Sequence, residues 1–143
     1  MEDTFRCQCP ITSGLDIFGD KWTLVIIKQM LFEEKCTFKD FTESQESIAT
    51  NILSARLKML EKFDIIKKGN RPDNKKTKIY TLTGKGLSFT PILIELMIWS
   101  KDNIQEFHPG LNIHPELDNI SKNKEQAYKQ IINTYNNYKE SLF

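Results

Sequence analysis

Residues 48–82, IATNILSARLKMLEKFDIIKKGNRPDNKKTKIYTL, carry the pattern that decides the fold. Apolar side chains recur three and four residues apart along the first half, which predicts an amphipathic helix from about Ile48 to Phe63. Two runs follow, at 65–68 and 78–82, and glycine, asparagine and proline lie between them. These runs are rich in β-branched and aromatic residues and predict strands. The stretch therefore predicts one helix followed by a two-stranded hairpin.

The face of this helix opposite its apolar side is short and polar. It carries Thr50, Asn51, Ser54, Ala55 and Lys58, with Arg56 on the flank. Nothing bulky or acidic interrupts this face before Glu61, so it can approach a DNA groove. The plainer interpretation is a solvated helix surface.

The hairpin loop holds the densest positive charge in the chain. Arg71, Lys75 and Lys76 stand against Asp73 alone, and three lysines, Lys78 among them, flank the loop. Cationic side chains in such a loop are suited to phosphate, whereas hydrogen-bonding side chains on a helix are suited to base edges. Because the helix face is suited to base edges and the loop to phosphate, we predict that both contact double-stranded DNA.

Two helices are predicted before this stretch. Proline suits the first turn of a helix, and Pro10 opens one that ends at Gly19. Asp20 then caps a second helix, from Lys21 to about Leu31, whose apolar stripe is too wide for an exposed helix. We expect the second helix to lie in the core.

A short third helix is expected to position the long one. Thr37 is predicted to be extended and to cap a helix from Phe38 to about Thr42. Its aromatic residues, Phe38 and Phe41, are expected to point inward. Lys39 is left on the outside, where it can contact DNA phosphate.

The chain after the hairpin is predicted to be helical. Thr83 caps a fifth helix that runs to about Glu106, and Pro91 either kinks this helix or lies where the turn before it loosens. Apolar and tyrosine side chains at helical spacing predict a last helix from Ser121 to Ser141. A break rich in proline and glycine separates the two.

The predicted order is helix, helix, short strand, helix, helix, hairpin, helix, which is that of a winged helix-turn-helix domain. The fold class is therefore mainly α with a small β-hairpin (α+β). Residues 1–107 are assigned to the DNA-binding domain, and residues 108–143 to a C-terminal helical extension with dimerisation as its candidate role. In this fold the fourth helix enters a major groove about 12 Å wide and the hairpin reaches the adjacent backbone.

Particular residues add a family resemblance. They are Cys9-Pro10, Gly19-Asp20-Lys21-Trp22-Thr23-Leu24, Phe38 and Phe41, Ile52-Leu53-Ser54, Arg56-Leu57, Leu60-Glu61, Tyr80-Thr81-Leu82-Thr83 with Gly86, and Pro91 with Trp99. Together they resemble the HxlR family of bacterial regulators, which is related to the MarR type. The resemblance implies a dimeric winged-helix protein that binds near-palindromic operators, with the fourth helix reading bases. In some members the cysteine before the first helix senses oxidants or electrophiles, and Cys9 matches that position.

The chain departs from this family pattern around the fourth helix. Asn51 and Ala55 stand where many relatives carry basic residues, so the contacts of those residues are lost. Ala49 has no side chain that can cap a helix, and Ser47 or Thr50 is expected to do so instead, which shifts the start of the helix.

Composition places the chain among ordinary globular proteins. Its 143 residues are 39% hydrophobic and 27% charged, enough for one core without disulfides. The opening residues Met1 to Arg6 carry neither a basic leader nor an apolar run, and no stretch is long enough to cross a bilayer. We therefore expect a cytoplasmic protein without a membrane partner. Trp22 and Trp99 are expected to anchor its core.

Three cysteines, Cys7, Cys9 and Cys36, cannot all pair within one chain, so thiols are the expected resting state. Cys9 lies at the start of the first helix, where the helix dipole lowers a thiol pKa and favours the reactive thiolate. Two roles remain open for Cys9: a sensor of a small electrophile or oxidant, with Cys7 close by, and an inert structural thiol. The cysteine spacing fits no common zinc site, and we expect no metal or cofactor.

No constellation of residues points to catalysis, because there is no nucleophile with a base, no phosphate-cradling glycine loop and no carboxylate pair at a sensible spacing. We predict a sequence-specific DNA-binding transcriptional regulator, in the first place a repressor, that acts as a homodimer held by the first and fifth helices. The alternative is a winged-helix module that binds another protein. The net charge of only +1 and the missing basic residues at positions 51 and 55 favour that alternative.

Overall fold

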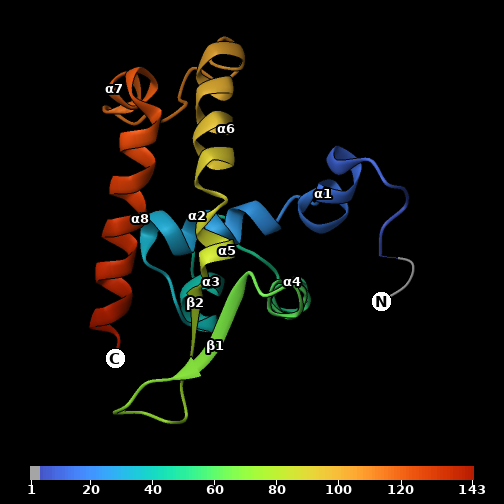
Figure 1. Cartoon of the computed structure of the whole chain (residues 1–143), viewed down its shortest axis with the longest axis vertical. Coiled ribbons are helices and arrows are strands. Elements are labelled where there is room, and N and C mark those ends of the chain that lie inside the picture. Colours follow the sequence, from blue (N-terminus) through green and yellow to red (C-terminus); the bar gives the residue numbers. More distant parts are fainter. Residues whose placement is uncertain (1–3) are drawn as a thin grey trace. The chain divides into compact units, whose positions relative to one another are not determined.

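The computed structural model describes residues 4–143, which form helices and one small sheet (Figure 1). The expectation about the opening residues Met1 to Arg6 lies partly outside the described residues. The chain divides into two compact units, which meet in sequence between Gly86 and Leu87. Within the described residues, no helix combines the length and the apolar character that a membrane crossing requires.

The first two helices lie in the predicted segments, and α1 begins at the predicted residue. α1 spans Pro10–Phe18, with proline in its first turn, and α2 spans Thr23–Glu33. Asp20 accepts hydrogen bonds from the N–H groups of Trp22 (2.9 Å) and Thr23 (3.0 Å), as predicted for the residue that caps this helix. α2 begins two residues later than expected, because the intervening turn brings these N–H groups to the carboxylate.

The start of α3, Phe38–Thr42, is closed by a reciprocal pair of side chains. The Thr37 hydroxyl accepts from the N–H of Asp40 (3.1 Å), and the Asp40 carboxylate accepts from the N–H of Thr37 (3.0 Å). The predicted cap at Thr37 is therefore confirmed. Phe41 is buried, whereas Phe38 is 37% exposed, so the expectation that both rings point inward is wrong. This helix of five residues turns one face to the core, and Phe41 occupies it.

α4 spans Thr50–Lys62 and buries Leu53, Leu57 and Leu60. It starts two residues later than predicted, and Ile48 is buried in the connection before it rather than in the helix.

The hairpin pairs β1, Ile66–Asn70, with β2, Lys78–Leu82, in antiparallel register. The N–H of Tyr80 also donates to the carbonyl of Cys36 (2.7 Å), so the segment before α3 lies alongside β2 as the predicted short extended piece. The mainly α fold with a small hairpin is thus confirmed.

α2, α3, α4 and the hairpin supply the core of the first unit. The fully buried apolar side chains of this unit are Ile26, Ile27, Met30, Phe41, Leu53, Leu60, Ile79 and Leu82. Burying a side chain of this size stabilises the fold by roughly 2 kcal/mol. α2 therefore lies in the core as predicted, but Trp22 is only half-buried, with Lys21 Nζ 5.0 Å from its ring centre. The expectation that Trp22 anchors the core is wrong, because it lies in the turn before α2.

The predicted fifth helix is two helices. α5 spans Gly84–Leu87 and α6 spans Thr90–Asn103. Thr83 accepts from the N–H of Gly86 (3.2 Å), which confirms it as the cap of the first piece. Of the two alternatives for Pro91, the loosened turn is the one observed: the helix is interrupted after Leu87, and Pro91 lies in the first turn of α6, where a missing N–H is harmless.

The second unit contains α6 and two tail helices, α7 (Leu117–Lys122) and α8 (Lys124–Ser141). Asn123 accepts from the N–H of Gln126 and caps α8, which begins three residues later than expected. α6 and α8 lie side by side (Figure 1), and Lys124 pairs with Glu95 at 2.6 Å. α6 thus packs with the tail, whereas the functional division at residue 107 stays a prediction.

Two helices expose apolar faces. α1 has no buried residue, and its Ile11 is 76% exposed and its Leu15 47% exposed. On α6, Ile92, Leu96 and Trp99 lie on one exposed face at helical spacing. Trp99 is 57% exposed, so the expectation that it anchors the core of this chain is wrong. Contiguous apolar faces of this kind mark interaction surfaces.

Candidate DNA interface and thiol site

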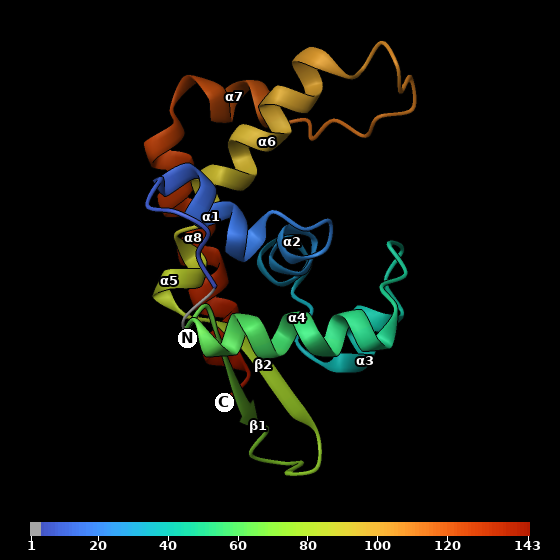
Figure 2. The ribbon, with the colours of Figure 1, turned by 90° about the vertical axis from the view of Figure 1, so that its right-hand side faces the viewer.

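α4 turns a polar face outward, opposite its buried leucines. Thr50, Asn51, Ala55 and Lys58 are exposed, and Ser54 is half-buried. The predicted exposure of this face is therefore observed. Figure 2 shows α4 lying across the hairpin, whose loop extends beyond the helix.

The start of α4 has no side-chain cap. Ala49 occupies the capping position in an extended conformation, and no side chain there accepts a hydrogen bond. The expectation that Ser47 or Thr50 caps this helix is wrong, since Ser47 adopts a left-handed conformation (φ 58°) in the turn and Thr50 is already helical. The first N–H groups of α4 thus remain without a side-chain acceptor, which favours a negative group at this end.

α2 fixes the turn that leads into α4. The buried Gln29 donates to Glu46 Oε1 (2.8 Å), and Lys28 Nζ contacts both Glu46 and Glu33. The hydrogen bond from Lys28 lowers the pKa of the Glu46 carboxyl. Burial opposes this shift, and the hydrogen bond from Gln29 adds to it. These contacts hold the connection before the recognition helix.

Two predicted DNA-contact residues have acidic neighbours. Arg56 Nη1 lies 3.5 Å from Asp20 Oδ1, with both side chains about one third exposed. Partial burial alone would raise the pKa of Asp20, but hydrogen bonds from Thr23 and Trp22 and the charge of Arg56 outweigh it and lower that pKa. Lys39 is highly exposed and lies 3.9 Å from Glu43 on the same helix, a weak surface pair.

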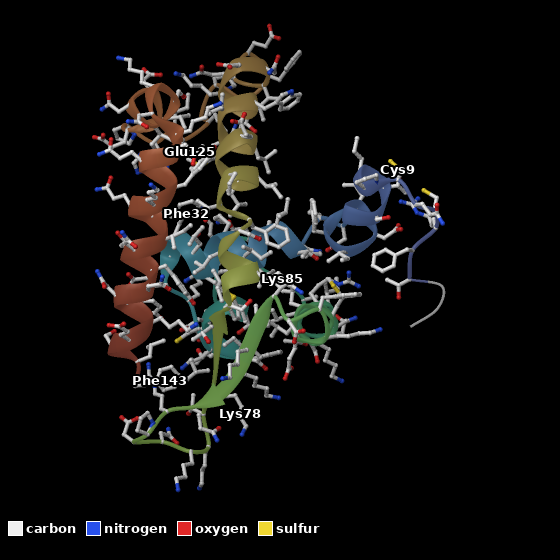
Figure 3. All side chains as sticks on the ribbon, viewed as in Figure 1. Cys9, Phe32, Lys78, Lys85, Glu125 and Phe143 are labelled. Atoms are coloured by element: carbon white, nitrogen blue, oxygen red, sulfur yellow. The ribbon has the colours of Figure 1, made fainter. Side chains whose placement is uncertain are left out.

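The hairpin loop displays its cations on an ordered turn. Asn74 organises this turn, because its side chain donates to Thr77 Oγ1 (2.9 Å) and accepts from the N–H of Lys76 (3.1 Å). Arg71, Lys75 and Lys76 are exposed. At the strand end, Lys78 Nζ donates to Asn70 Oδ1 (2.8 Å), and Figure 3 shows Lys78 on the hairpin close to the loop.

Lys67 and Lys68, two of the lysines predicted to flank the loop, are both exposed on β1 and extend its positive charge. Sequence reasoning missed the pairing of Asp20 with Arg56. This pairing had no local signal, because the two residues lie far apart in the sequence.

The two cysteines near the N-terminus are exposed, and Cys36 is buried. Cys9 precedes α1 (Figure 3) and does not cap it with a regular hydrogen bond. The N–H and hydroxyl of Thr12, followed by the N–H of Ile11, nevertheless lower the pKa of the Cys9 thiol. Ser13 ties both cysteines to this turn, because its hydroxyl donates to the Cys7 carbonyl (3.2 Å) and its N–H to the Cys9 carbonyl (2.8 Å).

These features fit a thiolate that can react with solutes. Within residues 4–143, no cluster of three or more histidine, cysteine or acidic side chains could hold a metal ion. The buried Cys36 instead serves the fold through its backbone contacts with Tyr80 and Asp40.

The chain is similar to known regulators over most of its length. The family model described as HxlR-like helix-turn-helix matches residues 17–108. The HTH-type transcriptional regulator YodB of Bacillus subtilis (strain 168) is 32% identical over 94 residues, which cover 65% of this chain and 83% of YodB.

Solved structures agree with this match. PA1607, described as a putative transcription factor, has a TM-score of 0.65 at 30% identity over 75% of this chain and 72% of its own. The reduced form of YodB has a TM-score of 0.55 at 30% identity over 73% of this chain and 100% of its own. The reduced form of the redox regulator HypR has a TM-score of 0.57 at 26% identity over 66% of this chain and 93% of its own. YodB has also been solved after diamide treatment and with a bound quinone.

The match confirms the resemblance drawn from the sequence, and with it the predicted class of DNA-binding transcriptional regulators. It ends at residue 108, before α7 and α8. With the polar face of α4 and the basic hairpin in the expected order, the chain belongs to the HxlR-like helix-turn-helix family.

Proposed function

We propose that this protein is a repressor that binds a near-palindromic operator as a homodimer and responds to thiol-reactive compounds through Cys9. The observation that carries the DNA-binding part is the combination, within one compact unit, of an exposed polar helix face on α4 and an exposed basic loop at 71–78. The location that we propose is the cytoplasm.

The residues divide into base-reading and phosphate-binding groups. On α4, Thr50, Asn51 and Ser54 carry the hydrogen-bonding groups that read base edges, and Ala55 leaves room for close approach. The phosphate-binding group comprises Lys39, Lys58, Arg71, Lys75, Lys76 and Lys78. The open N–H groups at the start of α4 add a further phosphate contact.

The exposed apolar faces of α1 and α6 support a homodimer. A second copy is the simplest partner that covers both faces, because two-fold pairing places the same surface on each side of the contact. The two recognition helices would then stand about 34 to 36 Å apart, or a multiple of that distance. Sedimentation should give a dimer at micromolar concentration, and a monomer would contradict this part of the proposal.

The exposure and lowered pKa of Cys9 support the thiol response. A quinone would add to the Cys9 thiolate at a ring carbon and take up a proton. A diazene oxidant such as diamide would accept two hydrogen atoms from two thiols, which become a disulfide. The second thiol is Cys7, or Cys9 of a second copy, because Cys36 is buried. Either change at the start of α1 alters a proposed dimer surface and weakens operator binding.

A winged module that binds another protein is the remaining alternative, and the family match does not favour it. Footprinting on DNA upstream of the protein's own coding region, with and without diamide, tests the proposal. We expect a two-fold symmetric footprint that diamide weakens in the wild type and in Cys36→Ser but not in Cys9→Ser. The absence of any protected sequence would contradict sequence-specific DNA binding. A footprint that diamide does not change would contradict only the role of Cys9.

A further inference from the structure

Asp20 joins two helices through one carboxylate. Its Oδ2 accepts from the N–H groups of Trp22 and Thr23 and caps α2, while its Oδ1 accepts from the Thr23 hydroxyl and pairs with Arg56 in the middle of α4. The residue that starts the buried helix thus also holds the flank of the helix that faces DNA.

Arg56 differs from the other cations of this surface. Lys58, two positions further on, is exposed, as are Lys75 and Lys76 in the loop. The Arg56 side chain is 34% exposed, and its guanidinium lies against Asp20. This guanidinium already has an anionic partner 3.5 Å away, so it is less available to a phosphate than the exposed lysines are.

The apolar contacts of α4 do not by themselves fix its rotation about its axis. Leu53, Leu57 and Leu60 form a non-directional apolar stripe, and packing of such a stripe tolerates small rotations. The ion pair on the flank, between Arg56 Nη1 and Asp20 Oδ1 at 3.5 Å, favours the rotation that keeps these two groups together. That rotation decides where Asn51 and Ser54 point.

Asp20 is itself held in place by the turn between α1 and α2. A Cβ at Gly19 would lie 2.5 Å from the carbonyl oxygen of Leu15, so this turn accepts only glycine and stays tight. The N–H of Gly19 donates to the same Leu15 oxygen (2.8 Å). The Asp20 carboxylate, which directly follows Gly19, is therefore held in place relative to α1 and α2.

We propose that Arg56 is a positioning residue, which Asp20 holds so that the polar face of α4 points at DNA, and that Arg56 does not itself contact DNA. The inference rests on the proposed role of α4 as the recognition helix. It departs from the sequence-based assignment of Arg56 as a DNA contact.

The effect of removing the negative charge of Asp20 distinguishes this account from simple electrostatics. Less negative charge near DNA would raise affinity if Asp20 acted only through its field. If Asp20 positions α4, its loss lowers specific affinity instead. Asp20→Asn is the suitable variant, because asparagine still accepts hydrogen bonds and caps α2 while it loses the ion pair.

The experiment uses a duplex that the wild-type full-length protein selects from a random DNA library, measured over a series of salt concentrations. We expect Asp20→Asn and Arg56→Gln each to lower affinity for this duplex about tenfold, the loss of a single base contact. Their salt slopes and their affinity for random duplex should equal those of the wild type. The double variant should be no weaker than either single variant, and Arg56→Lys should restore most of the affinity.

Lys58→Gln is the matched control, because this exposed lysine lies on the same helix and should lower the salt slope by about 1. Thermal melting without DNA verifies that each variant is folded. A salt slope reduced by about 1 in Arg56→Gln, or tighter binding by Asp20→Asn, would overturn the inference. Failure of the wild type to select any sequence would instead contradict the proposed function, and the inference would fall with it.

Discussion

The starts of α3 and α4 use their first N–H groups in opposite ways. At α3, Thr37 and Asp40 satisfy these groups within the protein. At α4, Ala49 offers no acceptor, while Thr50 and Asn51 lie exposed. A missing cap lowers stability by about 1 kcal/mol. α3, which positions its neighbour, is thus stabilised by its cap. α4, which is proposed to face DNA, lacks that stabilisation and keeps its first N–H groups open.

Removal of the closed start should have the largest effect on folding. Thr37→Ala with Asp40→Ala should lower the free energy of unfolding by about 2 kcal/mol, because both halves of the reciprocal cap are lost. Thr50→Ala, at the open start, should change it by less than about 0.5 kcal/mol. Urea denaturation measures both values. Equal losses in the two variants would break the comparison.

Asn51→Ala tests the open start through DNA rather than through folding. The variant loses the amide that can pair with a base edge, so discrimination at one base position should fall by about 1.4 kcal/mol, a factor of about ten. Affinity for random duplex should stay unchanged, because base contacts specify and phosphate contacts position. Competition with single-base variants of the selected duplex measures the effect. An equal loss of affinity for every duplex would mean that Asn51 contacts the DNA backbone instead of a base.

Ala49→Ser should convert the open start into a closed one. The backbone at this position is already extended (φ −64°, ψ 141°), so a serine hydroxyl can cap α4 and raise stability by up to about 1 kcal/mol. The same hydroxyl competes with a DNA phosphate for the N–H groups, and affinity should fall. Ala49→Val is the control, since valine keeps the extended backbone and offers no acceptor. If Ala49→Ser is more stable but its DNA affinity is unchanged, the start of α4 does not bind phosphate.

The smallest expected effect is on pH dependence. Burial alone would raise the pKa of Asp40, but hydrogen bonds from Cys36 and Thr37 and the charge of Lys35 outweigh it and lower that pKa in the folded chain. Asp40 therefore adds stability above its unfolded pKa of about 4, and this stability is lost as the pH falls through the lower folded value.

Unfolding free energies measured from about pH 5 to pH 2 should fall less steeply in Asp40→Asn than in the wild type. α4 has no acidic residue in its first turn, so Thr50→Ala should leave the pH profile as it is. Identical slopes in Asp40→Asn and the wild type would mean that this carboxylate is not held differently by the fold.

Features with a local cause were predictable from the sequence. Pro10, Asp20, Thr37 and Thr83 each act within a few residues of a helix start, and the structure places all four there. The polar face of α4 is likewise set by helical spacing alone.

Features that depend on tertiary contacts were not predictable. Pro91 marked the place of the break between α5 and α6 but left a kink as the alternative, and the exposure of Trp99 depends on what its helix packs against, which spacing does not encode. The pairing of Arg56 with Asp20 joins distant positions, so composition marked Arg56 only as a cation on a flank. Charge and spacing thus located the candidate surface, but only the folded structure shows which side chains contact each other.

The central claim is that α4 and the hairpin loop bind DNA together, and the salt dependence of binding tests it most directly. Affinity for the selected duplex is measured over a salt series for the wild type and for Lys75→Ala with Lys76→Ala, two exposed lysines of the ordered loop. We predict a linear fall of log K with log salt and a slope reduced by about 2 in the double variant, with specific and non-specific binding weakened together. Superimposable salt series for the two proteins would contradict the claim.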